Sequence, residues 1–141
     1  MQVFKRDGRT EPVQFDKITA RIKKLRYELH ESVDPAKVAM RVIEGVYDGV
    51  TTTELDNLAA EVAATNAVTH PDYASLASRI AVSNLHKATK KSFAETMEDL
   101  YTYVDPITGD DASLVAKDVI EIIRENAEFL DSQIIYDRDF N

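Results

Sequence analysis

Residues 3–13 have the sequence Val3-Phe4-Lys5-Arg6-Asp7-Gly8-Arg9-Thr10-Glu11-Pro12-Val13, with two short β-prone runs on either side of Asp7-Gly8. This dipeptide favours a two-residue type I′ turn, in which Gly8 adopts a positive φ without steric cost. The stretch therefore predicts a β-hairpin in which Arg6 lies opposite Arg9. Pro12 has no N–H to donate, so its strand is expected at a sheet edge. A lone hairpin is marginally stable, so this one is expected to pack on helices.

Two amphipathic helices are expected directly after the hairpin. The first begins with Asp16 as N-cap and continues for about three turns, because apolar residues recur at helical spacing. The second begins at Asp34-Pro35, an N-cap followed by proline at the first helical position, and ends at Gly49. The residues expected on their buried faces are Ile18, Ile22, Leu25, Leu29, Val38, Val42, Ile43 and Val46.

Two further helices complete an expected four-helix bundle. Thr51 and Glu54 form a capping box at the start of the third helix, and the fourth follows His70-Pro71. The residues expected on their buried faces are Leu55, Leu58, Ala59, Val62, Tyr73, Leu76, Ala77, Ile80, Ala81 and Leu85. The apolar pattern continues through Phe93, Met97 and Leu100, which would extend the fourth helix.

The last part of the chain predicts a helical appendage. A break is expected at residues 105–109, followed by a fifth helix that buries Val115, Val119, Ile122 and Ile123. Residues 134–140 contain apolar side chains with no evident partner. The expected fold class is mainly α (α+β), with an N-terminal β-hairpin on a four-helix bundle and then a short helical segment.

The composition narrows the possible functions. The chain has 141 residues and no cysteine, which excludes disulfides, cysteine zinc sites and thiol chemistry within it. Its N-terminus lacks an apolar signal region and no apolar run could span a bilayer, so a soluble cytoplasmic protein is expected. The histidines have no metal-ligand spacing, and no glycine-rich phosphate loop or catalytic triad pattern is present.

The charge is unevenly distributed. Residues 1–91 contain 14 Lys and Arg against 12 Asp and Glu, whereas residues 92–141 contain 3 against 13. A basic N-terminal region on an acidic chain suits a small anion, and the acidic remainder would repel duplex nucleic acid. The basic residues of the hairpin have a simpler alternative role as a solvated charged face. Lys87 and Lys90 share one side of the fourth helix, where the helix dipole favours cations in any case.

Several motifs resemble a known family. The pattern Val-x-Lys-Arg-Asp-Gly-Arg-x-Glu at residues 3–11 and the segment Phe15-Asp16-Lys17-Ile18 resemble the ATP-cone, a nucleotide-sensing domain. The segments at residues 49–56 and 70–74 are similar to the same domain. Residues 79–91, 97–101 and 136–140 resemble in particular the class I, eukaryotic-type ribonucleoside-diphosphate reductase large subunit.

The resemblance implies an allosteric site at which ATP leaves the reductase active and dATP inhibits it by promoting inactive oligomers. Carried over by position, the nucleotide contacts are Lys5, Arg6, Glu11, Pro12, Val13, Gln14, Phe15, Asp16, Lys17, Thr52, Asp56, Lys87 and Lys90. The cations would neutralise the triphosphate, and Thr52 and Asp56 would hydrogen-bond the base or sugar. Asp56 has the alternative role of a carboxylate that offsets the helix dipole. Magnesium is expected on the phosphates, with no site made of protein ligands alone.

The resemblance also implies a domain organisation. Residues 1–91 would form the regulatory ATP-cone, and residues 92–141 the helical start of a catalytic α/β barrel. The family's chemistry needs a thiyl radical and a redox-active cysteine pair, so this cysteine-free chain is not expected to be an enzyme by itself. Its parent would be an oxidoreductase that makes deoxyribonucleotides for DNA replication together with a radical-generating small subunit.

The sequence differs from the family pattern in two places, and it is compatible with two other functions. The segment around residues 30–33 is about one residue shorter than in similar proteins. The position occupied by Gln2 can take part in oligomer contacts, and the residue at this position varies in the family.

One alternative function is that of a cone-bearing transcriptional repressor, although such proteins carry a cysteine-rich zinc ribbon that is absent here. The other is a nucleotide-independent helical interaction module whose basic hairpin docks an acidic partner.

Overall fold

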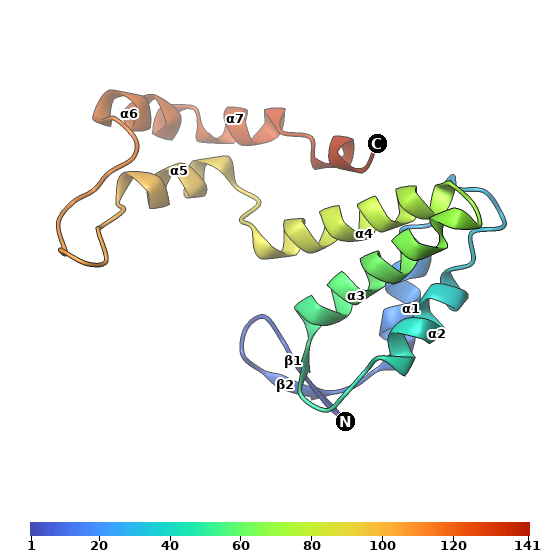
Figure 1. Ribbon diagram of the computed structural model, residues 1–141. Coiled ribbons are helices and arrows are strands. Elements are labelled where there is room, and N and C mark those ends of the chain that lie inside the picture. The colour runs from blue at the N-terminus through green and yellow to red at the C-terminus, as the bar shows by residue number, and fades with distance from the viewer. The chain divides into compact units, whose positions relative to one another are not determined.

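The computed structural model describes residues 1–141, which form seven α-helices, two short 3-10 helices and a small sheet (Figure 1). The chain divides into two compact units, residues 1–85 with Phe140 and residues 86–139 with Asn141. None of the helices combines the length and the apolar character needed to cross a membrane.

The sheet has three strands in the order β2-β1-β3. β1 (Gln2–Phe4) pairs antiparallel with β2 (Thr10–Pro12) and parallel with β3 (Val50–Thr51). The predicted hairpin and the edge position of the Pro12 strand are therefore confirmed. β3 was not predicted, because a two-residue strand is too short to show alternation. It makes β1 the central strand of the sheet.

The predicted two-residue turn of the hairpin is wrong. The N–H of Gly8 donates to the carbonyl of Lys5 (3.0 Å), and the N–H of Lys5 donates to the carbonyl of Arg9 (2.8 Å). The loop therefore has three residues, Arg6 to Gly8, and Lys5 rather than Arg6 lies opposite Arg9. A type I′ turn needs a positive φ at both central residues, whereas Gly8 has a φ of 82° and Asp7 does not have a positive φ.

α1 (Phe15–Lys24) differs from the prediction at both ends. Its N-cap is Gln14, which makes no side-chain capping bond, and Asp16 lies in the first turn. The helix ends before Leu25 and Leu29, which still pack against the core from the following turns. The turn that follows contains Glu28 with a φ of 58°, and a left-handed residue cannot continue an α-helix.

α2 (Pro35–Glu44) begins as predicted, because the Asp34 side chain accepts a hydrogen bond from the N–H of Ala36 (2.9 Å). The predicted end at Gly49 is wrong, since the C-cap is Gly45. Gly49 instead has a φ of 85°, and its N–H donates to the carbonyl of Gln2 (2.9 Å). Its positive φ turns the chain into β3.

The third and fourth helices follow the sheet. α3 (Thr52–Thr65) begins with the predicted capping box, in which Glu54 N–H donates to Thr51 Oγ1 (3.1 Å) and Thr51 N–H donates to Glu54 Oε2 (2.8 Å). The 3-10 helix η1 (Asn66–Val68) and α4 (Asp72–Ala88) come next. The prediction that the fourth helix continues to Leu100 is wrong, because α4 ends at Ala88.

One core joins the sheet to the first four helices. Its buried members come from β1, β3, α1, α2, α3 and α4 and from the loop before α2, and they include Val3, Ile22, Val33, Val38, Ala39, Val42, Val50, Leu55, Ala59, Ala63, Tyr73, Leu76, Ala77 and Ile80. The hairpin is thus held on the helices by burial of Val3, as a marginally stable hairpin requires.

The second unit is helical. α5 (Phe93–Tyr101) begins at Ser92, whose hydroxyl accepts from the N–H of Glu95 (3.2 Å). The predicted fifth helix corresponds to α6 (Lys117–Glu125), but its buried residues are Ile120 and Ile123, while Val119 and Ile122 are exposed. α7 (Ala127–Gln133) and the 3-10 helix η2 (Tyr136–Phe140) complete the chain.

Candidate functional site

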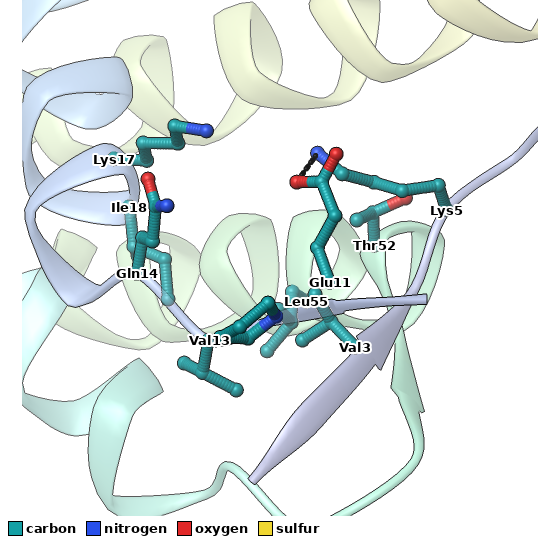
Figure 2. Close-up of a pocket in the computed structure, with 10 residues that line it drawn as sticks. Val3, Lys5, Glu11, Val13, Gln14, Lys17, Ile18, Thr52 and Leu55 are labelled. Carbon is teal, nitrogen blue, oxygen red and sulfur yellow. Dashed lines mark ion pairs between the residues drawn. The ribbon is translucent and has the colours of Figure 1, made fainter. Parts of the chain in front are cut away.

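A cavity lies where the hairpin meets α1 and α3 in the first unit (Figure 2). About 370 Å³ of atom-free space lies between its walls, including the part that is open to solvent. The residues that line it are Val3, Lys5, Glu11, Pro12, Val13, Gln14, Lys17, Ile18, Thr52 and Leu55.

Side chains alternate between the two faces of a strand, which explains which hairpin residues reach the cavity. Side chains two positions apart share one face of a sheet, so Val3 and Lys5 point the same way, as do Glu11 and Val13. Val3 is also the register partner of Glu11, which places both side chains on that face. The hairpin therefore contributes both apolar and charged groups to one wall.

Helical spacing explains the other two walls. Gln14, Lys17 and Ile18 are separated by three and four positions, so they share one side of the start of α1. Thr52 and Leu55 are three positions apart in the first turn of α3. The capping box at Thr51 fixes where this turn begins, and thus the position of the Thr52 hydroxyl at the cavity.

The cavity has an apolar floor and a charged rim. Val3 and Leu55 are buried members of the core, and Val13 and Ile18 pack against that core. Lys5 Nζ lies 3.3 Å from Glu11 Oε2 at the rim. Figure 2 shows this ion pair on the hairpin side and Lys17 on the α1 side. Such a site can bury a flat apolar group and neutralise an anionic one.

The hairpin loop carries a second ion pair. Asp7 Oδ2 lies 2.7 Å from Arg9 Nε, and Asp7 Oδ1 accepts from the N–H of Arg9 (3.1 Å). These hydrogen bonds, with the one from the backbone N–H contributing most, lower the pKa of the Asp7 carboxyl below its usual value. The pKa of Arg9 is raised by the same side-chain hydrogen bond. Arg9 is therefore engaged by Asp7 at the exposed end of the hairpin.

A polar network surrounds Asp56, one helical turn after Thr52. The two Asp56 oxygens are bound by Arg6 of the hairpin loop (3.0 Å) and by Arg21 of α1. Arg21 also lies 3.3 Å from Ser83 Oγ, and Arg6 hydrogen-bonds Asn84. Asp56 is only 7% exposed. The network thus ties the loop, α1, α3 and α4 together around one buried carboxylate.

The structure brings together some of the residues singled out from the sequence and not others. Those that line the cavity are Lys5, Glu11, Pro12, Val13, Gln14, Lys17 and Thr52. Arg6 and Asp56 belong to the polar network. Phe15 and Asp16 lie in the first turn of α1 with exposed side chains. Lys87 and Lys90 belong to the second unit, where Lys90 pairs with Asp99.

Six residues of this region were not singled out as site residues. Val3, Ile18 and Leu55 form the cavity floor, and their strand or helix periodicity could have placed them beside the charged residues. The other three, Arg21, Ser83 and Asn84, belong to the polar network. For Arg21 the position one turn after Lys17 is the only sequence signal. No group of three or more His, Cys, Asp or Glu side chains could hold a metal ion.

Comparison with known proteins identifies the family. Residues 1–88, which contain the whole cavity and the polar network, match the ATP cone domain. This chain belongs to the ATP-cone family. The resemblance seen in the hairpin motif of the sequence is therefore confirmed, and it extends over α1 to α4.

The ATP-cone chain has relatives in several groups of organisms. It is 58% identical to the ribonucleoside-diphosphate reductase large subunit of Danio rerio over 142 residues, covering all of this chain and 18% of that protein. It is 62% identical to the large subunit of Arabidopsis thaliana over 141 residues, covering 17% of that protein. The large subunit of Vaccinia virus is 56% identical, with 18% covered. The chain thus spans less than a fifth of the length of these relatives.

Proposed function

We propose that this chain binds adenine nucleotides in the cavity between the hairpin, α1 and α3, and that the bound nucleotide regulates a ribonucleotide reductase. The observation that carries the proposal is the combination of an apolar floor with the cationic side chains of Lys5 and Lys17. The family match and the reductase relatives support the same assignment.

The chemistry of the cavity suits the two ends of a nucleotide. Adenine is flat and largely apolar, so the floor formed by Val3, Ile18 and Leu55 can bury it. The triphosphate carries a charge near −4, which lysine and arginine stabilise through charge-assisted hydrogen bonds. The proposed contacts are those carried over by position: Lys5, Arg6, Glu11, Pro12, Val13, Gln14, Phe15, Asp16, Lys17, Thr52, Asp56, Lys87 and Lys90.

Magnesium is proposed to enter this site already bound to the phosphates of the nucleotide. Magnesium in proteins is usually held by one or two carboxylates together with phosphate oxygens and water. The only carboxylate that lines the cavity is Glu11, and it is paired with Lys5. The residues therefore do not form a dedicated metal cage, and the phosphates would supply most of the ligands.

The proposed regulation concerns the longer reductase. ATP would leave the enzyme active, and dATP in the same cavity would inhibit it by promoting inactive oligomers. The boundary proposed for the regulatory domain is residues 1–91, with residues 92–141 leading to a catalytic α/β barrel. The parent oxidoreductase is proposed to carry out the reduction together with a radical-generating small subunit, and to be cytoplasmic. No catalytic activity is proposed for this cysteine-free chain by itself.

Calorimetry on the 141-residue chain tests the proposal. Mg–ATP and Mg–dATP are expected to bind competitively at one region, while Mg–GTP and Mg–dTTP bind much more weakly. A hundredfold excess of nucleotide over its Kd is expected to stabilise the fold by about 2.7 kcal/mol, visible as a rise in melting temperature. A folded chain that gives neither heat nor a thermal shift with either adenine nucleotide would refute the proposal and favour a nucleotide-independent interaction module.

A further inference from the structure

The side chain of Arg6, in the hairpin loop, is held through one of its three nitrogens. Its Nη2 donates to Asp56 Oδ2 (3.0 Å) and to Asn84 Oδ1. A guanidinium carries five N–H groups, two on each terminal nitrogen and one on Nε. The two hydrogen bonds use both protons of Nη2, so the three N–H groups on Nη1 and Nε remain as donors for a ligand. The side chain is 27% exposed, so the guanidinium is not closed off from solvent.

Asn84, on α4, is the neutral one of these two acceptors. Its amide oxygen holds Arg6 without cancelling the positive charge, whereas a carboxylate also competes with an anion for that charge. Two acceptors on the two protons of Nη2 fix the plane of the guanidinium, because one hydrogen bond alone leaves the group free to turn about that bond. Asn84 therefore orients a side chain that Asp56 anchors.

A second asparagine sets the orientation of the Asn84 amide. Asn84 Nδ2 donates to Asn57 Oδ1 on α3 (2.7 Å). The amide nitrogen thereby faces α3, and the amide oxygen faces Arg6. The reverse orientation would place the amide N–H groups against guanidinium N–H groups, which cannot accept a hydrogen bond. The series Asn57, Asn84 and Arg6 thus connects α3 and α4 to the hairpin loop, with a donor facing an acceptor at each step.

The Arg6 guanidinium lies next to the cavity. Lys5, which lines the cavity, directly precedes Arg6 in the sequence. Asp56 follows Thr52, another cavity residue, by four positions on α3. Side chains at this spacing are neighbours on a helix surface. Asn84 does not line the cavity, so it can act on a ligand there only through another residue.

We infer that Asn84 is a positioning residue that orients the Arg6 guanidinium for the phosphates of the bound nucleotide. This inference rests on the proposed function. A hydrogen bond weakens steeply when its N–H does not point at the acceptor, so the donors of Arg6 need a fixed plane. Without Asn84, Arg6 keeps its charge and its anchor at Asp56 but loses that plane. Part of its contribution to affinity is then lost, and part remains.

A double-mutant cycle on ATP affinity tests the inference, because a residue that acts through Arg6 has no effect once Arg6 is absent. Calorimetry gives the Kd of Mg–ATP for the wild-type chain, Arg6→Ala, Asn84→Ala and the double variant. Arg6→Ala is expected to weaken binding about tenfold or more, and Asn84→Ala about fivefold. The double variant is expected to bind within about twofold of Arg6→Ala.

Lys5→Ala supplies the matched cycle, since Lys5 is another hairpin cation assigned to the nucleotide but pairs with Glu11. The losses of Lys5→Ala and Asn84→Ala are expected to multiply. A purely structural role of Asn84 would lower affinity by the same factor with and without Arg6.

Asn57→Ala, at an exposed position, is the second variant, because it releases the Asn84 amide. It is expected to weaken ATP binding about threefold in the wild type and not in Arg6→Ala. It decides the question if circular dichroism shows that Asn84→Ala does not fold.

Three results would overturn the inference: wild-type affinity in folded Asn84→Ala or in Arg6→Ala, a loss in their double variant equal to the product of the single losses, or the same lack of additivity in the Lys5 cycle. A wild-type chain that binds no adenine nucleotide at all would instead overturn the proposed function. The wild-type ATP measurement therefore separates the two failures.

Discussion

Lys5 and Arg9 face each other across the hairpin, with the N–H of Lys5 2.8 Å from the carbonyl of Arg9. The three residues between them form the loop that presents Arg6 to Asp56. Gly8 closes this loop with a φ of 82°, a left-handed conformation that costs other residues about 1–2 kcal/mol. A side chain at Gly8 would meet no atom within 4 Å, so any effect of substitution is conformational rather than steric.

Gly8→Ala is therefore expected to destabilise the fold by about 1 kcal/mol, and Gly8→Asn by less, because asparagine tolerates the left-handed region. Chemical denaturation measures both values. Gly109→Ala is the matched control: Gly109 also has a positive φ (76°) and no atom within 4 Å of an added Cβ, but it belongs to the second unit. Only the Gly8 substitutions are expected to weaken ATP binding as well. Equal stability of Gly8→Ala and wild type would contradict this account of the loop.

Thr51 sets the first turn of α3 and with it the position of Thr52 at the cavity. Replacing an N-cap threonine by alanine removes a hydrogen bond to an otherwise unpaired backbone N–H. We expect Thr51→Ala to cost about 1 kcal/mol in the free energy of unfolding. Thr53→Ala, at an exposed position two residues later, serves as the control and should change stability little.

The other half of the capping box predicts a pH dependence. The backbone N–H of Thr51, followed by its hydroxyl, lowers the pKa of Glu54 below its usual value of 4.5. A carboxyl whose pKa is lowered by folding stabilises the fold above its unfolded pKa and loses that effect as the pH falls through its folded pKa. The difference in melting temperature between wild type and Glu54→Gln should therefore be constant near neutral pH and shrink below 4.5. A difference that grows in acid would contradict the assigned hydrogen bonds.

The domain boundary leads to a truncation experiment. A chain cut after Lys91 keeps the cavity, the polar network and the region matched by the ATP cone domain, which ends at residue 88. Its ATP affinity is expected to stay within about threefold of the 141-residue chain, less than about 0.7 kcal/mol. Circular dichroism checks that the shortened chain folds. If it folds and yet loses tenfold or more in affinity, the proposed boundary at residue 91 is wrong.

The features that could be predicted from the sequence depend on neighbouring residues. Asp34-Pro35 and the Thr51–Glu54 box determine helix starts through hydrogen bonds that span only a few positions, and both were confirmed. The hairpin itself was confirmed, but Asp7-Gly8 is compatible with loops of two or three residues. The register that decides between them depends on packing of the whole sheet, which the dipeptide does not specify.

The features that were missed depend on contacts between distant segments. β3 exists because Val50 pairs with Val3, and two residues carry no periodic signal of their own. Arg21 and Asp56 are 35 positions apart, and each alone looks like one more charge on a helix face. The extension of α4 into α5 was predicted from apolar spacing, whereas Ser92 caps a separate helix. The family resemblance therefore supplied residues of the cavity walls together with Arg6 and Asp56, whereas the ion pair between Arg21 and Asp56 was not predicted.

Alanine variants of Lys5 and Lys87 distinguish a nucleotide site from a merely charged surface. Lys5 pairs with Glu11 at the cavity rim with both side chains about a third exposed, so Lys5→Ala should change the free energy of unfolding by no more than about 0.5 kcal/mol. If Lys5 contacts a triphosphate, the same substitution removes a charge-assisted hydrogen bond and weakens ATP binding about ten- to a hundredfold. Lys87→Ala should weaken ATP binding to a similar extent although Lys87 lies 82 positions after Lys5, because both lysines are assigned to one ligand. Calorimetry and thermal melts on both variants, with Lys23→Ala as an exposed control, provide the comparison. Wild-type affinity in both Lys5→Ala and Lys87→Ala would show that these lysines do not contact the nucleotide and that the proposed site is wrong.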